Sequence, residues 1–265
     1  QGIDVVFYLI HSMTGGDKQF ERNDRTAAEN VAQAASLSSV KRIIYLGGLG
    51  DRSSMQSPHL RSRHEVGDIL RTSKIPVTEL RAGIIIGPGS ASFEMIHHLV
   101  NRLPIMICPR WVNVKTQPIG IDDVLNYLVE SVNNEATKGQ MIDIGSPEIL
   151  GFKEMMLAVA KVLKLKRWII PVPVLTPKLS SYWMNLITPI PVSLARILIE
   201  SLRYETICEN KKAKELFTFT PASFDCVVFA DLLEHLYDPW GLLLKFKNFL
   251  APNGFILISI PNVRH

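Results

Sequence analysis

The stretch "VKRIIYLGGLG", residues 40–50, decides the fold class. Its β-branched and aromatic residues form an almost continuous apolar run, which is typical of a strand buried on both faces of a parallel sheet. The same character is found upstream in "GIDVVFYLI" (2–10) and downstream in "VTELRAGIIIG" (77–87). Each of these three runs therefore predicts a strand.

Helical patterns separate the predicted strands. Alanines recur with helical spacing from Asp24 onward, and a second helical pattern runs from residue 58 to about residue 72. Alternating strands and helices of these lengths form βαβ units, whose right-handed crossovers place successive strands side by side. The sequence therefore predicts an α/β protein with a doubly wound, Rossmann-like parallel sheet.

Composition excludes several classes of protein. The 265 residues carry a net charge of +4 with the basic residues spread along the chain, which argues against a nucleic-acid binder. The three cysteines, Cys108, Cys208 and Cys226, are far apart and predict neither a zinc site nor a disulfide framework, so a reducing cytoplasm is expected. Prolines and charges interrupt the apolar region 168–199, which excludes a transmembrane segment there. This region either packs on a membrane surface or forms an apolar wall of a substrate site, and we favour the wall.

The glycines of the second predicted strand do not form a dinucleotide-binding turn. No GxGxxG or GxxGxxG pattern opens a helix anywhere in the sequence, although such a turn normally holds the cofactor pyrophosphate. Gly47, Gly48 and Gly50 lead instead into a polar loop containing a proline, and we attribute them to tight turn geometry.

Two ionisable residues lie four positions apart in "SPHLRSRHEVG" (57–67). His59 and Arg63 therefore share one face of the predicted helix. They are either a proton donor with its electrostatic partner or two solvated residues at a helix start. The guanidinium would lower the pKa of His59 and leave less imidazolium at neutral pH.

Six stretches together resemble a known family: "YLIHSM", "VKRIIYLGGLG", "SPHLRSRHEVGDILR", "VTELRAGIIIGPGSASFEM", "QPIGIDDV" and "PVPVLTP". They are similar to atypical short-chain dehydrogenase/reductases of the NmrA-like, bacterial NAD(P)H-binding group. In that family a first third with the glycine-rich turn precedes the stretch matched by residues 2–13. The resemblance implies a partial Rossmann-like domain, residues 1–223, that lacks its first strands and binds NAD or NADP weakly.

The resemblance also implies site residues. His59 and Arg63 stand where active members carry a catalytic Tyr and Lys, and Gly47 or Gly48 stands at the position of the catalytic Ser. The implied contacts with the cofactor come from the following residues: His11, Ser12, Met13, Gly47, Gly48, Arg63, Arg81, Ala82, Gly83 and Ile84. No metal site is expected, because no third ligand accompanies His235 and its neighbouring Asp.

A substrate lobe is implied around residues 151–205, and nothing in it identifies the substrate. Nearby, Asp122 and Asp123 open a predicted helix, where we expect a carboxylate to cap free backbone amides.

The last stretch, residues 224–265, has a pattern of its own. "FDCVVFA" (224–230) and "FILISI" (255–260) predict strands, with a helix over 240–250 and a turn at Pro252, Asn253 and Gly254 between them. This βαβ piece resembles the middle of class I S-adenosylmethionine-dependent methyltransferases, which implies that Asp231, Glu234 and His235 lie near a methyl donor.

Three functions follow as hypotheses. The first is hydride transfer from NAD(P)H to a small carbonyl or quinone-type substrate. The second is a non-enzymatic NADP-binding redox sensor with a protein partner, which the change from Tyr and Lys to His59 and Arg63 favours. The third is methyl transfer by residues 224–265, which lack the upstream adenosine-binding loop of that family.

Overall fold

The computed structural model divides the chain into two compact units, residues 1–216 and 217–265. It describes residues 2–12, 17–52, 57–172, 187, 189–217, 224–230, 240, 243–244 and 250–259. We call residues 1–216 the main unit and residues 217–265 the C-terminal unit.

The main unit is built on a parallel sheet in the order β1-β2-β3-β8. Its strands are β1 (Val5–Tyr8), β2 (Arg42–Gly48), β3 (Val77–Ala82) and β8 (Met141–Ile144). The first three lie side by side in chain order, which confirms the predicted βαβ arrangement.

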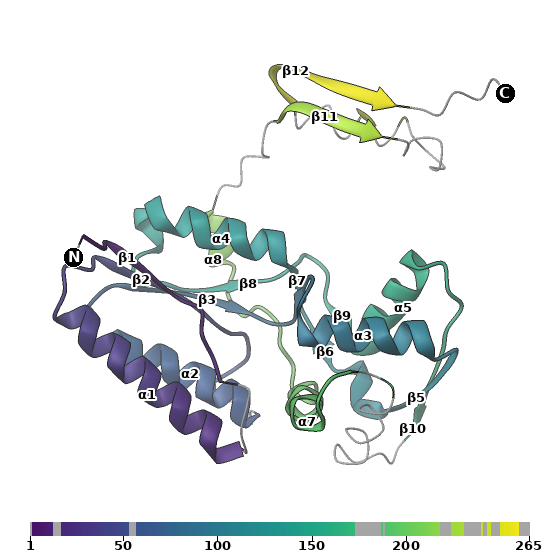
Figure 1. Cartoon of the computed structure of the whole chain (residues 1–265), viewed down its shortest axis with the longest axis horizontal. Coiled ribbons are helices and arrows are strands. Elements are labelled where there is room, and N and C mark those ends of the chain that lie inside the picture. Colours follow the sequence, from purple (N-terminus) through teal and green to yellow (C-terminus); the bar gives the residue numbers. More distant parts are fainter. Residues whose placement is uncertain are drawn as a thin grey trace. The chain divides into compact units, whose positions relative to one another are not determined.

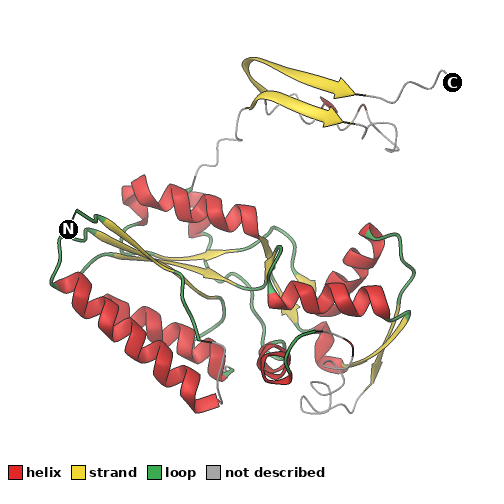
Figure 2. Ribbon diagram, in the orientation of Figure 1, coloured by secondary structure: helices red, strands yellow, loops and turns green. Residues whose placement is uncertain are grey.

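Helices cover both faces of this sheet (Figure 1; Figure 2). On one face lie α1 (Asp17–Ser36) and α2 (Pro58–Arg71), which pack against each other. On the other lies α4 (Ile121–Asn133), followed by the short 3-10 helix η2 (Glu135–Thr137) and, later in the chain, α8 (Lys212–Leu216). The core between the sheet and the first helix pair includes Tyr45, Val66 and Leu70.

Two predicted elements have different bounds from those expected. The helix expected from Asp24 begins at Asp17. The strand expected over 2–10 is limited to the four residues of β1, and it is not buried on both faces. Phe7 is 44% exposed because β1 is an edge strand that pairs only with β2 among the described strands.

The predicted third strand breaks at Gly83 and Ile84. β3 ends at Ala82, and the chain then forms β4 (Ile85–Ile86), which pairs with β7 (Ile119–Gly120) in a second small sheet. Gly83 is required here because a Cβ would lie 3.2 Å from the carbonyl oxygen of Gln117. The break carries the chain from the main sheet to a second layer of structure.

That second layer, which we call the lobe, has its own apolar core. It is built from α3 (Ala91–Arg102), β5 (Ile105–Pro109), η1 (Arg110–Asn113), β6 (Lys115–Thr116), β9 (Leu150–Gly151), α5 (Phe152–Val162), β10 (Trp168–Val172) and α7 (Val192–Ser201). The lobe as defined here includes residues before 151, because α3 packs against α5.

The start of α4 differs from the capping prediction. Its N-cap is Gly120, and no side chain makes a capping hydrogen bond there. Asp122 and Asp123 lie in the first turn, where a negative charge still interacts favourably with the helix dipole.

A buried arginine links the carboxyl-terminal end of α4 to the main sheet by hydrogen bonds. Arg42 is 1% exposed, and its guanidinium donates to Thr78 Oγ1 at 2.9 and 3.1 Å. It also donates to the carbonyl oxygens of Val132 and Asn134, at 3.3 and 3.0 Å, and to the hydroxyl of Thr137.

The C-terminal unit contains a parallel pair of strands, β11 (Phe224–Ala230) and β12 (Leu250–Ser259). The strand predicted over 224–230 is confirmed. The expected turn at residues 252–254 lies instead within β12, where the register shifts so that Phe224 pairs with Leu250 and Cys226 with Phe255. Most of the helix predicted over 240–250 lies outside the described residues, as do Asp231, Glu234 and His235.

Candidate functional site

A cleft of about 530 Å³ opens in the main unit at the carboxyl ends of β2 and β3. Ligands of open α/β sheets bind at this end of the strands. The lining includes the following residues: His11, Gly48, Ser57, His59, Leu60, Ala82, Gly83, Ile84, Ser90, Lys115, Thr116, Phe152, Leu198, Leu202, Tyr204 and Thr206. One side of the cleft thus belongs to the main sheet and the other to the lobe.

The amino end of α2 holds His59 at the cleft. Ser57 is the N-cap, and its hydroxyl accepts a hydrogen bond from the amide of Leu60 at 3.2 Å. Pro58 follows at the first helical position, where its fixed φ suits a helix start. The sequence "SPHL" therefore places the His59 side chain one residue inside a well-defined helix terminus.

His59 is neutral at physiological pH. Burial, followed by the nearby Arg63 guanidinium and then His11, lowers its pKa to about 4. Its Nε2 atom is buried and has no hydrogen-bond partner among the residues the structure describes. The ring contacts His11, with 6.1 Å between centroids, and Phe20, with 6.5 Å. The pKa of His11 is also lowered, mainly by burial.

Arg63 has a structural set of contacts. It is 7% exposed and is absent from the cleft lining. Its guanidinium donates to the carbonyl oxygens of Ile10, at 3.4 Å, and Leu46, and it lies 5.4 Å from the ring centroid of Tyr45. Arg63 and His59 therefore share a helix face, as predicted, but the guanidinium is directed at strand carbonyls.

Gly47 and Gly48 serve close packing. A Cβ on Gly48 would lie 2.7 Å from Leu60 Cδ1, and a Cβ on Gly47 would lie 2.8 Å from Glu79 Oε1. The end of β2 therefore approaches α2 and β3 more closely than a side chain would allow, which replaces the tight-turn explanation. Gly48 lines the cleft, whereas Gly47 does not.

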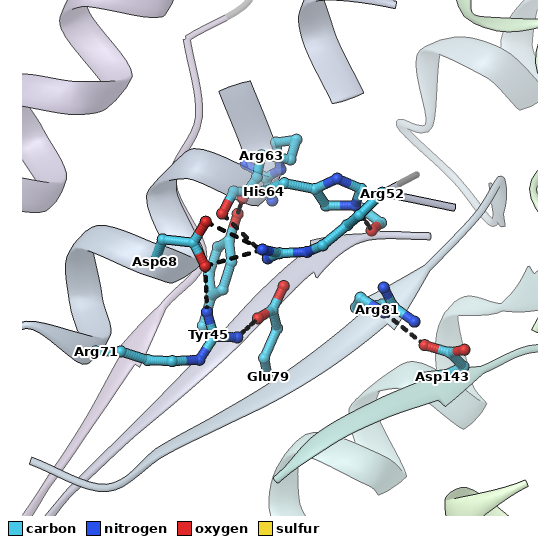
Figure 3. A network of polar contacts seen from close by, with 10 residues as sticks. Tyr45, Arg52, Arg63, His64, Asp68, Arg71, Glu79, Arg81 and Asp143 are labelled. Carbon is cyan, nitrogen blue, oxygen red and sulfur yellow. Dashed lines mark hydrogen bonds and ion pairs between the residues drawn. The ribbon is translucent and has the colours of Figure 1, made fainter. Parts of the chain in front are cut away.

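A polar network behind the cleft locks α2 to the sheet (Figure 3). Glu79 on β3 is fully buried, and Arg71 binds its carboxylate. Arg71 also binds Asp68 at 2.9 Å, and Asp68 in turn binds Arg52 at 2.9 Å. His64 Nε2 lies 3.1 Å from the carbonyl oxygen of Gly48, and burial lowers the pKa of His64 to about 4.

The remaining predicted residues are divided between the cleft and its surroundings. Ala82, Gly83 and Ile84 line the cleft. Arg81 does not, because its side chain is buried against Asp143, with 2.6 Å between Nε and Oδ1. The backbone amide of Ser12 donates to Asp24 Oδ1 at 2.6 Å, away from the lining. Met13 lies outside the described residues.

The structure thus brings six of the predicted residues to one cleft: His11, Gly48, His59, Ala82, Gly83 and Ile84. Sequence reasoning missed the hydroxyl groups that line it from the lobe. Thr116 and Thr206 meet through their hydroxyls at 2.6 Å, although they are 90 residues apart. Ser90, by contrast, follows the Gly-Pro-Gly turn and could have been found from that turn signal.

Of the apolar region 168–199, the structure describes residues 168–172, 187 and 189–199, and these contribute only in part to the cleft. Leu198 lines it, whereas Trp168 is 68% exposed and is not part of the lining. The described ranges hold no group of three or more His, Cys, Asp or Glu side chains suited to share a metal ion. Within these same ranges, no helix has both the length and the apolar character needed to cross a bilayer.

Comparison with known families gives one partial match. A model described as a methyltransferase domain matches residues 187–258, which is 72 of the 265 residues. The match starts in the main unit, where α7 and the segment around Thr206 pack, and extends into the C-terminal unit. No curated protein matches the sequence.

Solved structures match much more of the chain. A nucleoside-diphosphate-sugar epimerase from Staphylococcus aureus shares 18% identity, with a TM-score of 0.62, over 82% of this chain and 72% of its own. A triphenylmethane reductase from Citrobacter sp., solved with NADP(H), shares 16% identity, with a TM-score of 0.63, over 81% and 72%. A UDP-glucuronic acid 4-epimerase from Bacillus cereus, solved with NAD, shares 16% identity, with a TM-score of 0.54, over 77% and 73%. The chain therefore has the Rossmann-like α/β fold of these epimerases and reductases.

Proposed function

We propose that the main unit is an NAD(P)(H)-binding domain of the short-chain dehydrogenase/reductase type. In this proposal it takes part in hydride transfer to a small carbonyl or quinone-type substrate. The observation that carries it is the cleft itself, where the ends of β2 and β3 meet a neutral histidine with an unpartnered ring nitrogen. The separated cysteines support a cytoplasmic location.

The residues of the cleft suit the nicotinamide end of the cofactor better than its pyrophosphate. Gly48 and residues 82–84 line the cleft without a charged side chain, which suits an uncharged ring better than a pyrophosphate. Lys115 is the only lysine or arginine among the described residues of the lining, and its Nζ is ion-paired with Glu154 at 2.8 Å. Because the sequence also lacks a glycine-rich phosphate turn, we expect the free dinucleotide to bind weakly.

A bound nicotinamide would supply the hydride, and His59 would orient the acceptor. A histidine with a pKa near 4 is not an imidazolium at neutral pH, so the proton that the reduced substrate oxygen takes up would come from water and not from His59. Its neutral ring can still donate or accept one hydrogen bond at the unpartnered Nε2. We therefore assign His59 the role of holding the substrate oxygen.

The other lining groups favour an uncharged substrate. Leu60, Phe152 and Leu198 are apolar, and Thr116 and Thr206 offer hydroxyls. A charged substrate would need a free counter-ion in the lining, since burying an unpaired charge is costly. These features support a small carbonyl compound or a quinone.

A second candidate is a regulator that binds the cofactor but catalyses no reaction. The contacts of Arg63 favour it, because a guanidinium already bonded to the carbonyl oxygens of Ile10 and Leu46 cannot assist a reacting group. In such a protein the cleft would report the redox state of the cofactor to a protein partner.

The test is NADPH oxidation by the 265-residue chain with a panel of quinones and carbonyl compounds. His59→Phe should abolish turnover, whereas the matched control His97→Phe, on α3 outside the cleft lining, should not. Turnover that survives His59→Phe would remove His59 from the site. Calorimetric NADPH binding without any turnover would favour the regulator, and a Kd below about 10 µM would contradict the expected weak binding.

A further inference from the structure

The outer face of the lobe carries a row of exposed apolar side chains. β5 and β10 pair in parallel, with Ile105 beside Trp168 and Ile107 beside Ile170. Alternation along a strand puts these four side chains on one face, where they are 56%, 68%, 56% and 49% exposed in that order. We call this the β5–β10 face.

The opposite face of the same strand pair is packed. Met106 is 1% exposed and belongs to the lobe core, and Ile169 packs against that core. The strand pair therefore has one side that stabilises the lobe and one side that does not. None of the four residues of the β5–β10 face lines the cleft. Their exposure is thus unexplained by either the core or the proposed function.

Basic side chains gather at one end of this face. Because the strands are parallel, the residues that precede β5 and β10 lie at the same edge. They are Arg102 before β5, and Lys164, Lys166 and Arg167 before β10.

None of these four cations has a carboxylate partner within the described part of the chain. Arg102 donates to the carbonyl oxygen of Ile187. Arg167 donates to the carbonyl oxygens of Val100 and Asn101. Across segments 91–112 and 152–172 there are seven Lys and Arg residues against two Glu residues. The lobe therefore has a marked positive charge, although the whole chain is only mildly basic.

We propose that the β5–β10 face docks on the surface of an anionic lipid bilayer. Aliphatic side chains and a tryptophan would enter the headgroup boundary, where tryptophan is favoured, while the adjacent cations meet lipid phosphates. Figure 1 shows β5 and β10 at the end of the lobe that lies away from the main sheet. The contact is peripheral and involves no spanning helix.

The composition of the face favours lipid over an acidic protein. Lysine is depleted in protein interfaces relative to the rest of a surface, whereas lysine beside an apolar face is typical of interfacial membrane binding. The face is also an open strand pair with Trp168 at one end, which suits a planar bilayer.

Vesicle co-sedimentation of the 265-residue chain tests this proposal. We expect binding to phosphatidylglycerol-containing vesicles, little binding to pure phosphatidylcholine, and weakening with added salt. Trp168→Ser with Ile170→Ser should reduce the bound fraction at least tenfold, as should Lys164→Glu with Lys166→Glu. The controls are Leu37→Ser, an 84% exposed apolar residue in the turn directly after α1, and Lys211→Glu, an exposed lysine outside the lobe. Circular dichroism spectra and melting curves of each variant verify folding.

Three results would overturn the proposal. The first is the absence of binding to anionic vesicles, and the second is equal loss of binding in the control variants. The third is retention on polyglutamate beads without vesicle binding, which would identify an acidic peptide as the partner instead.

Discussion

The imidazole rings of His11 and His59 meet edge to face, with their centroids 6.1 Å apart. Burial lowers the pKa of both rings, and Arg63 lowers them further. Two histidines at such a short separation can share a site when both are neutral, since two imidazolium ions would repel each other. Both rings are therefore neutral at physiological pH, and His59 becomes charged only in acid, near pH 4.

We expect the main unit to lose stability as the pH falls from about 6.5 to 4. His59 has a pKa of about 4 in the folded chain against an ordinary value of 6.5, so the unfolded chain takes up its proton first. The contribution of neutral His59 to the free energy of unfolding is complete above pH 6.5 and is lost by pH 4. Its size is up to about 3 kcal/mol. Urea denaturation between pH 7 and pH 4 measures it. His59→Phe should reduce this dependence and leave the part due to His64, whose pKa is also about 4, and an unchanged slope would contradict the assignment.

Gly67→Ala should destabilise the chain, although alanine is the better helix former. A Cβ at residue 67 would lie 2.8 Å from Glu79 Oε2, inside the contact distance of a buried carboxylate. We expect a loss of about 1 to 3 kcal/mol, which is typical of overpacking. Thermal and urea denaturation measure this loss. In a Glu79→Ala background the same substitution should cost much less, and equal costs in both backgrounds would refute the steric explanation.

Asp143→Ala should be strongly destabilising. The Arg81–Asp143 pair is 4% and 0% exposed, and Asp143 Oδ2 also accepts from the amides of Glu209 and Asn210 at 2.9 and 3.2 Å. Removing the carboxylate leaves a buried guanidinium, which costs about 3 to 5 kcal/mol. The double variant Arg81→Met, Asp143→Leu should recover part of the loss, and equal denaturation midpoints for single and double variants would argue against a buried-charge effect.

We expect no retention of S-adenosylmethionine by this chain. The methyltransferase model matches residues 187–258 only, and the residues of the main unit within that match pack into the lobe and against β6. Equilibrium dialysis with labelled S-adenosylmethionine tests this, with an active methyltransferase as the positive control. Binding that survives addition of excess unlabelled NADPH would show an independent site in the C-terminal unit.

Local sequence patterns predicted the scaffold of the cleft well. The bounds of β2 and α2 follow from an apolar run and from the cap sequence "SPHL", which act over a few residues. The family resemblance implied cofactor contacts at Gly48 and residues 82–84, and these residues line the cleft because the ends of parallel strands form one edge of a sheet.

Contacts between distant residues could not be predicted in the same way. The acceptors of Arg63 are backbone carbonyls, which every residue has, so no pattern marks Ile10 or Leu46 as its partners. The hydroxyl pair of Thr116 and Thr206 depends on a bridge between segments 90 residues apart. Such contacts follow from the packing of the lobe on the sheet.

The buried hydrogen bonds of Arg42 affect how the carboxyl-terminal end of α4 unfolds. Helix ends are usually the first parts of a protein to fray, but the last carbonyls of α4 receive a guanidinium that is shielded from water. Releasing that helix end would leave the buried Arg42 guanidinium without these two hydrogen-bond acceptors. Amide protons near residues 130–134 should therefore exchange with deuterium only in global unfolding events, more slowly than those at the amino end of the same helix.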